Sequence, residues 1–161
     1  MRHLARHATE AGRVYFTGGV TALLLKWRLS TIDIDLKMVP EQDALFRALP
    51  VLKESLEINV ELASPDDFIP AVPGWEARSP LIVTHGLLSF HHFDLYSQAL
   101  SKIERGHDRD MKDVSSMLEL GFIERSSTLD YFNQIEGFLY RYPAIDPKGF
   151  RRAVERAVAN A

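Results

Sequence analysis

The sequence contains no cysteine, and that absence alone excludes disulfides, thiolate zinc sites and a cysteine nucleophile. It also lacks any hydrophobic run of the roughly 20 residues that cross a bilayer. Residues 1–7 contain no apolar core of signal-peptide length. We therefore expect no membrane partner and, by default, a cytoplasmic location.

The chain carries little net charge of either sign. Its 19 lysines and arginines against 22 aspartates and glutamates give a formal net charge of -3. Bulk charge therefore provides no general attraction for nucleic acid. A basic face is predicted only on the last helical segment, which is either a docking helix with a solvated face or a contact for an RNA acceptor or acidic partner. Its basic residues are Lys148, Arg151, Arg152 and Arg156.

The length of the chain, 161 residues, is typical of one domain. No internal repeat, low-complexity tract or long linker interrupts it. We expect a single domain over residues 1–161, with a sheet core over residues 14–92 and a helical part over residues 94–161. The predicted fold class is α/β or α+β, with a mixed sheet of four or five strands.

Strands are predicted where β-branched residues cluster or where apolar and polar residues alternate. The expected strands cover residues 14–17, 32–36, 57–62, 81–84 and 87–90. The last two flank a His-Gly pair and form a predicted hairpin.

Helices are predicted from breaker-free segments and from capping residues at their starts. The first two cover residues 3–11 and 21–29, and a third opens at Pro40 with a kink or break at Pro50. The C-terminal half is expected to be helical. Its four helices run from Asp94 to Gly106, from Asp108 to Gly121, from Ser127 or Thr128 onward, and from Asp146 onward.

Two carboxylates in one predicted strand form the most informative pattern. Asp33 and Asp35 project to one face, while Ile32, Ile34 and Leu36 project to the other. At a separation of about 5 Å and an effective dielectric of about 20, two such charges repel by about 3 kcal/mol. A bound cation or an arginine usually neutralises such a pair, and hard oxygen ligands suit Mg²⁺ or Mn²⁺.

A glycine pair precedes these acids, between a predicted strand and a predicted helix. Gly18 and Gly19 let backbone N–H groups approach a phosphate closely, and Thr21 adds a hydroxyl donor. A phosphate cradle followed about 15 residues later by a metal-binding acid pair is what phosphoryl or nucleotidyl transfer requires. Taken singly, the glycine pair is more often a turn device and the acid pair a solvated edge; their combination is more specific.

The order of these motifs resembles the nucleotidyltransferase superfamily, which includes DNA polymerase β and the AbiEii-type toxins. It is most similar to small bacterial members related to AbiEii. The resemblance covers roughly residues 14–120 and continues with a strand carrying a third acid, here Glu61. Two positions differ from the usual pattern: Val20 separates the glycines from Thr21, and the third acid is a glutamate with Asn59 alternating onto its face.

The resemblance implies an enzyme that moves a nucleoside monophosphate from a nucleoside triphosphate to a hydroxyl or amine acceptor, either RNA, protein or a small molecule. Asp33 and Asp35 would bind Mg²⁺ or Mn²⁺, and Glu61 would complete the catalytic set. Gly18, Gly19 and Thr21 would hold the terminal phosphates. A homodimer or a neighbouring chain would supply the acceptor-binding surface that a domain of this size lacks.

A charged helical segment follows the pattern of the same family. Lys102 and Arg105 share one helix face, as do Asp110 and Asp113. The resemblance implies that Lys102 and Arg105 contact nucleotide phosphates and that the two aspartates support the site. The alternative is a salt-bridge network between two helices around the turn at Gly106.

Two other functions are left open. The first is a non-catalytic binding module that retains the fold, for example a component of a toxin–antitoxin pair. The second is a histidine-based metal hydrolase, suggested by the histidines near residues 85–94 and by His107-Asp108. No H-E-x-x-H pattern supports it, and His91 and His92 point to opposite faces on a strand.

Overall fold

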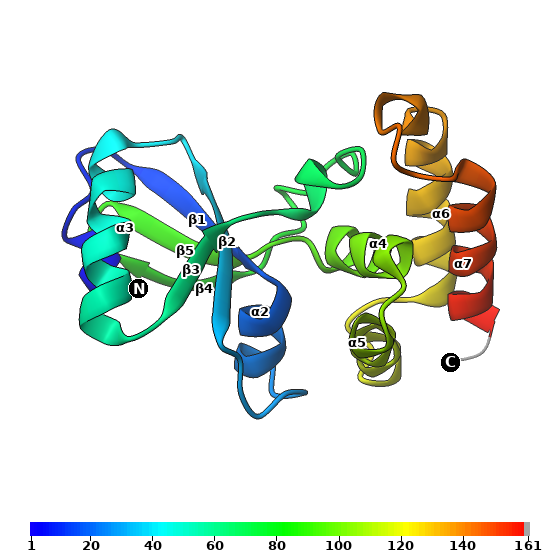
Figure 1. Cartoon of the computed structure of the whole chain (residues 1–161), viewed down its shortest axis with the longest axis horizontal. Coiled ribbons are helices and arrows are strands. Elements are labelled where there is room, and N and C mark those ends of the chain that lie inside the picture. Colours follow the sequence, from blue (N-terminus) through cyan, green and yellow to red (C-terminus); the bar gives the residue numbers. More distant parts are fainter. Residues whose placement is uncertain (160–161) are drawn as a thin grey trace. The chain divides into compact units, whose positions relative to one another are not determined.

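The computed structural model describes residues 1–159 of the chain. Those residues form an α+β fold with a five-stranded mixed sheet and seven α-helices (Figure 1). The fold class and the strand number predicted from the sequence are therefore confirmed. The strands are β1 (Gly12–Thr17), β2 (Asp33–Val39), β3 (Asn59–Leu62), β4 (Leu81–His85) and β5 (Leu88–His92). The α-helices are α1 (Arg2–Ala5), α2 (Gly18–Leu24), α3 (Asp43–Leu56), α4 (Leu95–Arg105), α5 (Asp108–Glu119), α6 (Arg125–Glu136) and α7 (Pro147–Ala159).

The strands lie in the order β3-β2-β1-β5-β4. β1 pairs antiparallel with β2 and parallel with β5, so it occupies the centre of the sheet. β3 pairs parallel with β2, and β4 pairs antiparallel with β5, as expected for the predicted hairpin. Because β1 and β2 are antiparallel, the start of β2 lies beside the end of β1, where Thr17 is in register with Asp35.

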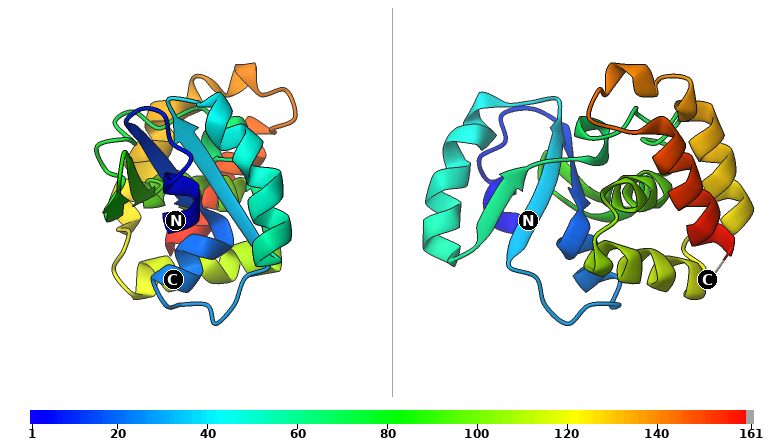
Figure 2. Two further views of the ribbon diagram at one scale, coloured as in Figure 1. Left: turned by 90° about the vertical axis from the view of Figure 1, so that its left-hand side faces the viewer. Right: turned by 45° about the vertical axis from the view of Figure 1, so that its right-hand side comes forward.

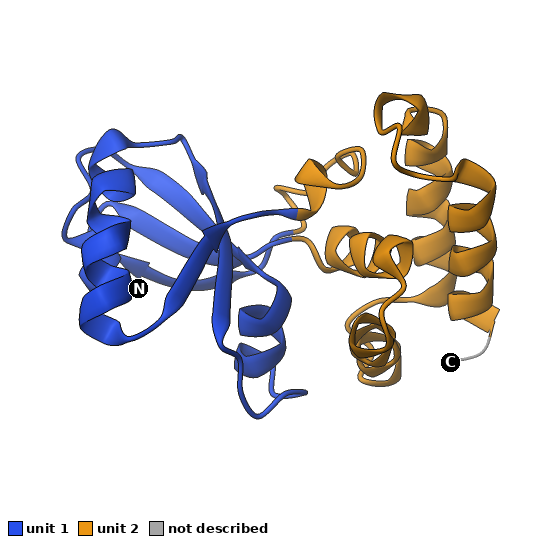
Figure 3. Ribbon diagram, viewed as in Figure 1, with its two compact units in different colours: residues 1–64, 79–93 blue, residues 65–78, 94–161 orange. Residues whose placement is uncertain are grey.

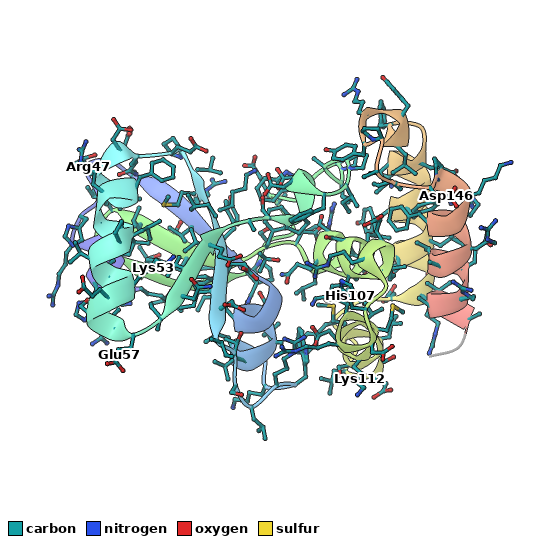
Figure 4. All side chains as sticks on the ribbon, in the orientation of Figure 1. Arg47, Lys53, Glu57, His107, Lys112 and Asp146 are labelled. Carbon is teal, nitrogen blue, oxygen red and sulfur yellow. The ribbon has the colours of Figure 1, made fainter. Side chains whose placement is uncertain are left out.

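One face of the sheet is covered by α3 (Figure 2). Alternate residues of the central strands, such as Val14 and Phe16 of β1 and Leu36 of β2, are buried with the apolar face of α3. Each large apolar side chain buried in this way contributes roughly 1.5–3 kcal/mol. The polar face of α3 carries residues such as Arg47, which is exposed (Figure 4).

The described chain divides into two compact units (Figure 3). Among the described residues, the sheet unit comprises residues 1–64 and 79–93, and the helical unit comprises residues 65–78 and 94–159. The chain passes from the sheet unit to the helical unit between Phe93 and Asp94. The loop over residues 65–78, by contrast, belongs to the helical unit although strands β4 and β5 follow it.

Two predicted N-terminal helices are shorter than expected. α1 ends at Ala5 because the side chain of Gln42 accepts a hydrogen bond from the Thr9 backbone N–H and donates one to the Glu10 carbonyl. α2 starts at Gly18, before the predicted position, and ends at Leu24. Beyond it the backbone N–H groups of residues 27 and 28 both donate to the carbonyl of Ala22, which turns the chain away from the helix.

Three further helix boundaries differ from the prediction. α3 begins at Asp43 rather than Pro40 and continues through Pro50, where its buried residues on either side keep the helix packed. α5 has His107 instead of Asp108 at its N-cap position, a shift of one residue, and the His107 side chain makes no capping hydrogen bond. α6 begins at Arg125, because the hydroxyl of Thr128 donates to the Glu124 carbonyl one turn earlier instead of capping the helix.

Candidate nucleotide-binding site

The sheet unit places three acidic residues on two neighbouring strands. Asp33 and Asp35 both lie on β2, two residues apart, so their side chains project to the same face. In the register of β2 with β3, Asp33 is opposite Asn59 and Asp35 is opposite Glu61. The three carboxylates therefore share the face of the sheet opposite to the Leu36 core position.

Ile32, which was predicted to lie in this strand on the face opposite the acids, precedes β2 and is 84% exposed. Strand pairing begins at Asp33, and the hydroxyl of Thr31 donates to the Asp33 carbonyl at 3.0 Å. The preceding loop therefore ends directly at the first acid. Leu29 in the same loop is 99% exposed, so this loop presents two large apolar side chains.

Asn59 links two of the carboxylates. Its side-chain nitrogen Nδ2 donates to Oδ1 of Asp33 at 2.8 Å and to Oε1 of Glu61 at 3.1 Å. Asp33 and Glu61 are exposed, whereas Asn59 and Asp35 are half-buried. One amide group therefore holds an acid of β2 and an acid of β3 together at the edge of the site.

The glycine pair lies against this group of residues. Gly18 has φ +62, and a β-carbon on Gly18 would come within 2.5 Å of Oδ2 of Asp35. A β-carbon on Gly19 would come within 2.1 Å of Oγ1 of Thr31. Glycine is required at both positions because the first turn of α2 passes directly beside the acidic strand and its preceding loop.

Thr21 has a contact that the sequence analysis did not predict. Its side chain is fully buried, and the hydroxyl donates to the Phe16 carbonyl at 3.1 Å. Nδ1 of His92 lies 3.4 Å from the same hydroxyl. Burial lowers the pKa of His92 to about 4, so this imidazole is neutral at pH 7. In this structure Thr21 therefore ties α2 to the end of β1, and its phosphate-binding role stays a prediction.

The oxygen ligands of this site are of the kind that Mg²⁺ prefers. Mg²⁺ usually binds through one or two carboxylates, several waters and substrate phosphates, and Asp33 and Asp35 supply two such carboxylates. Within residues 1–159, no group of three or more His, Cys, Asp or Glu side chains is placed to hold a metal ion. Asp33 and Asp35, on one face of β2, fit a two-carboxylate site, and Asn59 binds Glu61 beside them.

Lys37 extends the polar face and was missed in the sequence analysis. It follows Asp35 by two residues on β2, on the same face, and is in register with Tyr15 of β1. The signal was present in the sequence, because the alternation that identified the acids continues through Leu36 to Lys37. A lysine at this position adds a positive charge beside the acid pair.

The other predicted site residues lie in the helical unit and form an ion-pair network of their own. Nζ of Lys102 lies 3.1 Å from Oδ1 of Asp110 and 2.6 Å from Oδ2 of Asp113. Arg105 also contacts Oδ1 of Asp110, at 2.9 Å. Lys102 is 3% exposed and Asp113 2% exposed. The salt-bridge network between α4 and α5 that the sequence analysis gave as the alternative is present, and a phosphate contact by Lys102 or Arg105 stays a prediction.

A second, partly buried ion pair of the helical unit was also missed. Nε and Nη2 of Arg78 donate to the two carboxylate oxygens of Asp94 at 3.0 Å and 2.9 Å. Asp94 also caps α4 by accepting from the Ser97 N–H, as predicted. The guanidinium of Arg78 lies 4.2 Å from the ring centroid of Tyr131. Nothing in the sequence pairs Arg78 with Asp94, because the partners are 16 residues apart and in different elements.

One histidine and one C-terminal arginine of the predicted alternatives, His91 and Arg151, have defined partners. His91 lies on β5, where its ring nitrogens contact the Ser79 carbonyl and the Ser89 hydroxyl. On α7, Arg151 binds Glu136 of α6 and lies over the ring of Phe132. One of the four residues of the predicted basic face, Arg151, is thus engaged in helix packing, whereas Lys148, Arg152 and Arg156 are exposed.

Comparison with known proteins identifies the family. A model of the family described as nucleotidyltransferase of unknown function (DUF6036) matches residues 1–132. The match spans most of the 161 residues, so the chain belongs to this nucleotidyltransferase family. The predicted membership of the nucleotidyltransferase superfamily is thereby confirmed, whereas the closer relation to AbiEii stays a prediction. No curated protein and no solved structure gives a significant match. In the part of the chain that the structure describes, no helix has the length and apolar character needed to cross a membrane.

Proposed function

We propose that this member of the nucleotidyltransferase family is a metal-dependent enzyme that transfers a nucleoside monophosphate from a nucleoside triphosphate to a hydroxyl or amine acceptor. The observation that carries the proposal is the contact between Gly18 and the carboxylate of Asp35. A phosphate held by the backbone of the glycine turn would lie beside the acid pair. The same motif order supports a closer relation to the AbiEii-type toxins.

Asp33 and Asp35 are the proposed ligands of Mg²⁺ or Mn²⁺. When bound, the ion would supply the positive charge that neutralises the triphosphate and the developing charge of the transition state. Lys37 lies on the same strand face and is proposed to add to this charge. Gly18 and Gly19 would leave the backbone of the turn accessible to the terminal phosphates.

The reaction itself is a displacement at the α-phosphorus. The acceptor oxygen or nitrogen forms a bond to phosphorus, and the bond from phosphorus to the oxygen bridging the α- and β-phosphates breaks. The leaving group is pyrophosphate. The proton of the acceptor goes to a carboxylate, for which Glu61 is proposed because it is opposite Asp35 in the strand register and exposed.

Calorimetric titration of ATP, GTP, CTP and UTP in the presence of Mg²⁺ tests the proposal. We expect at least one triphosphate to bind the wild-type protein, and we expect binding to require both Mg²⁺ and Asp35. Asp35→Asn keeps the size of the side chain and removes its charge, so it should abolish metal-dependent binding. Binding that is unchanged in Asp35→Asn, or no binding of any triphosphate, would contradict the proposal.

One observation favours a second candidate, a non-catalytic binding module. Leu29 and Ile32 are 99% and 84% exposed in the loop that precedes Asp33, and such side chains often mark a protein contact. Under this alternative a partner chain binds wild-type protein and the Asp33→Asn, Asp35→Asn double variant with equal affinity. Loss of partner binding in Leu29→Ser, Ile32→Ser with retained nucleotide binding would assign the loop to a partner and the acids to the nucleotide.

A further inference from the structure

Asn59 is in direct contact with the proposed metal site, and the sequence motifs do not explain the role of this side chain. It is half-buried on β3, opposite Asp33 in the register and two residues before Glu61. Its side-chain nitrogen donates hydrogen bonds to two carboxylates, at 2.8 Å to Asp33 and 3.1 Å to Glu61. An amide nitrogen carries two hydrogens, so one nitrogen satisfies both acceptors.

The two bonds leave one oxygen of each carboxylate outside the contact with Asn59. The amide binds Oδ1 of Asp33 and Oε1 of Glu61, so Oδ2 and Oε2 are the oxygens that it does not bind. A carboxylate fixed through one oxygen by a hydrogen-bond donor presents the other in a defined direction. Outer groups that orient metal ligands in this way typically change metal affinity by about 10–100-fold when they are removed.

We propose that Asn59 is a positioning residue of the metal site, an inference that rests on the proposed function. It holds Asp33 for the metal ion and keeps Glu61 beside Asp33, which brings the third carboxylate to the acid pair. The amide also offsets the repulsion between two carboxylates that neighbouring strands bring together. A positively charged residue in the same place would compete with the cation for the carboxylates, whereas a neutral amide orients them and leaves their charge intact.

The test measures metal binding itself, by electron paramagnetic resonance of Mn²⁺ added to the full chain without nucleotide. We expect Asn59→Ala to weaken Mn²⁺ binding by at least about tenfold. Asn133→Ala is the matched control, because it makes the same change in the helical unit, where Asn133 accepts a hydrogen bond from Arg151. The control should bind Mn²⁺ as the wild type does.

A second readout separates positioning from folding. Asn59→Ala should bind nucleotide with near wild-type affinity once Mg²⁺ is raised about tenfold or more, since its carboxylates are displaced but still present. Asp35→Asn should not recover at any Mg²⁺ concentration. Circular dichroism and the thermal midpoint of Asn59→Ala should stay close to those of the wild type, since both hydrogen bonds are solvent-exposed.

The outcomes distinguish this inference from the proposed function. If wild type binds Mn²⁺, Asp35→Asn does not, and Asn59→Ala binds like wild type, the metal site stands and the role of Asn59 is overturned. If wild type itself does not bind Mn²⁺, the proposed function fails and this inference fails with it. If Asn59→Ala loses Mn²⁺ binding and excess Mg²⁺ does not restore nucleotide binding, Asn59 is a direct component of the site, which overturns its assignment as a positioning residue.

Discussion

Gly18 lies so close to Asp35 that a β-carbon on the glycine would come within 2.5 Å of Oδ2 of the aspartate. The glycine belongs to the first turn of α2 and the aspartate to β2, so this contact joins the two motifs that the sequence places 17 residues apart. The positive φ of Gly18, +62, is a second reason for glycine at this position.

Gly18→Ala should therefore displace the carboxylate of Asp35 and abolish metal-dependent nucleotide binding. The added methyl group meets a side-chain oxygen, so the carboxylate must rotate away from the metal position. We expect a stability loss of about 1 kcal/mol or more from the positive φ alone. Calorimetry with Mg²⁺ and the triphosphate that binds best, together with urea denaturation, measures both effects.

Gly86→Ala is the matched control for this prediction. Gly86 has φ +56, but a β-carbon there would meet no atom within 4 Å. It should show the stability loss of the positive φ and retain nucleotide binding. Equal nucleotide binding in Gly18→Ala and Gly86→Ala would show that the contact with Asp35 has no role in the site.

Lys102→Ala should destabilise the protein by about 3–5 kcal/mol, because it removes the cation from the buried carboxylate of Asp113 and leaves Asp110 with Arg105 alone of its two cations. Asp113 is 2% exposed and Asp110 7% exposed, so water reaches neither readily. Urea denaturation of the full chain measures the change. Lys112→Ala, on the exposed side of α5 (Figure 4), is the matched control and should change stability by less than about 0.5 kcal/mol.

A Lys102→Ala variant that is as stable as Lys112→Ala would mean that the ion-pair network contributes nothing to folding. The phosphate-binding role inferred from the family resemblance would then be the better explanation for a lysine at this position. Nucleotide titration of Lys102→Ala is informative only if the variant is folded, which the denaturation curve establishes.

Much of the sheet was predictable from local pattern. The alternation of residues 32–36 identified β2 and put both aspartates on one face, and the His-Gly turn identified the hairpin of β4 and β5. Asp94 was identified as the cap of α4 because the preference of aspartate for this position is local. These features depend on residues that are close together in the chain, so they can be predicted from a single sequence.

The features that could not be predicted depend on distant side chains. Gln42 ends the first helix by bonding residues 9 and 10, which lie more than 30 positions earlier. The link from Asn59 to Asp33 spans 26 positions and requires the register of β2 with β3. Ile32 was placed in the strand because alternation alone does not say at which residue strand pairing begins.

Asp94 supports the helical unit in two ways, and two substitutions separate them. Asp94→Asn keeps an oxygen that caps α4 but removes the charge that binds Arg78, so we expect a loss of about 1–3 kcal/mol. Asp94→Ala removes the cap as well and leaves the guanidinium without its carboxylate, which should cost about 3–5 kcal/mol.

Asp146→Ala is the control: Asp146 accepts from the Lys148 N–H at α7 (Figure 4) and is exposed, so its loss should cost about 1 kcal/mol. Equal losses in Asp94→Asn and Asp94→Ala would rule out a separate capping contribution.

His92 should make the stability of the protein depend on pH between 7 and 5. Burial lowers its pKa to about 4 in the folded state, whereas the unfolded chain has the ordinary value of 6.5. Below pH 6.5 the unfolded chain therefore binds a proton that the folded protein does not bind until about pH 4. Unfolding becomes more favourable as the pH falls, by about 1–2 kcal/mol between pH 7 and pH 5.

Urea denaturation at both pH values checks this prediction, with His92→Gln as the test variant and His7→Gln as the control. Glutamine does not titrate, so His92→Gln should lose most of the pH dependence even if it is less stable at pH 7. His7 is exposed, and its replacement should leave the dependence as it is in the wild type. The measured pH range ends at 5 so that Glu136 does not contribute. The hydrogen bond from Arg151 lowers the pKa of Glu136 below its usual 4.5, so protonation of this carboxylate reduces stability only in more acidic solution. A pH dependence that survives unchanged in His92→Gln would place its origin in another group and would imply that the pocket around His92 accepts the charged imidazole.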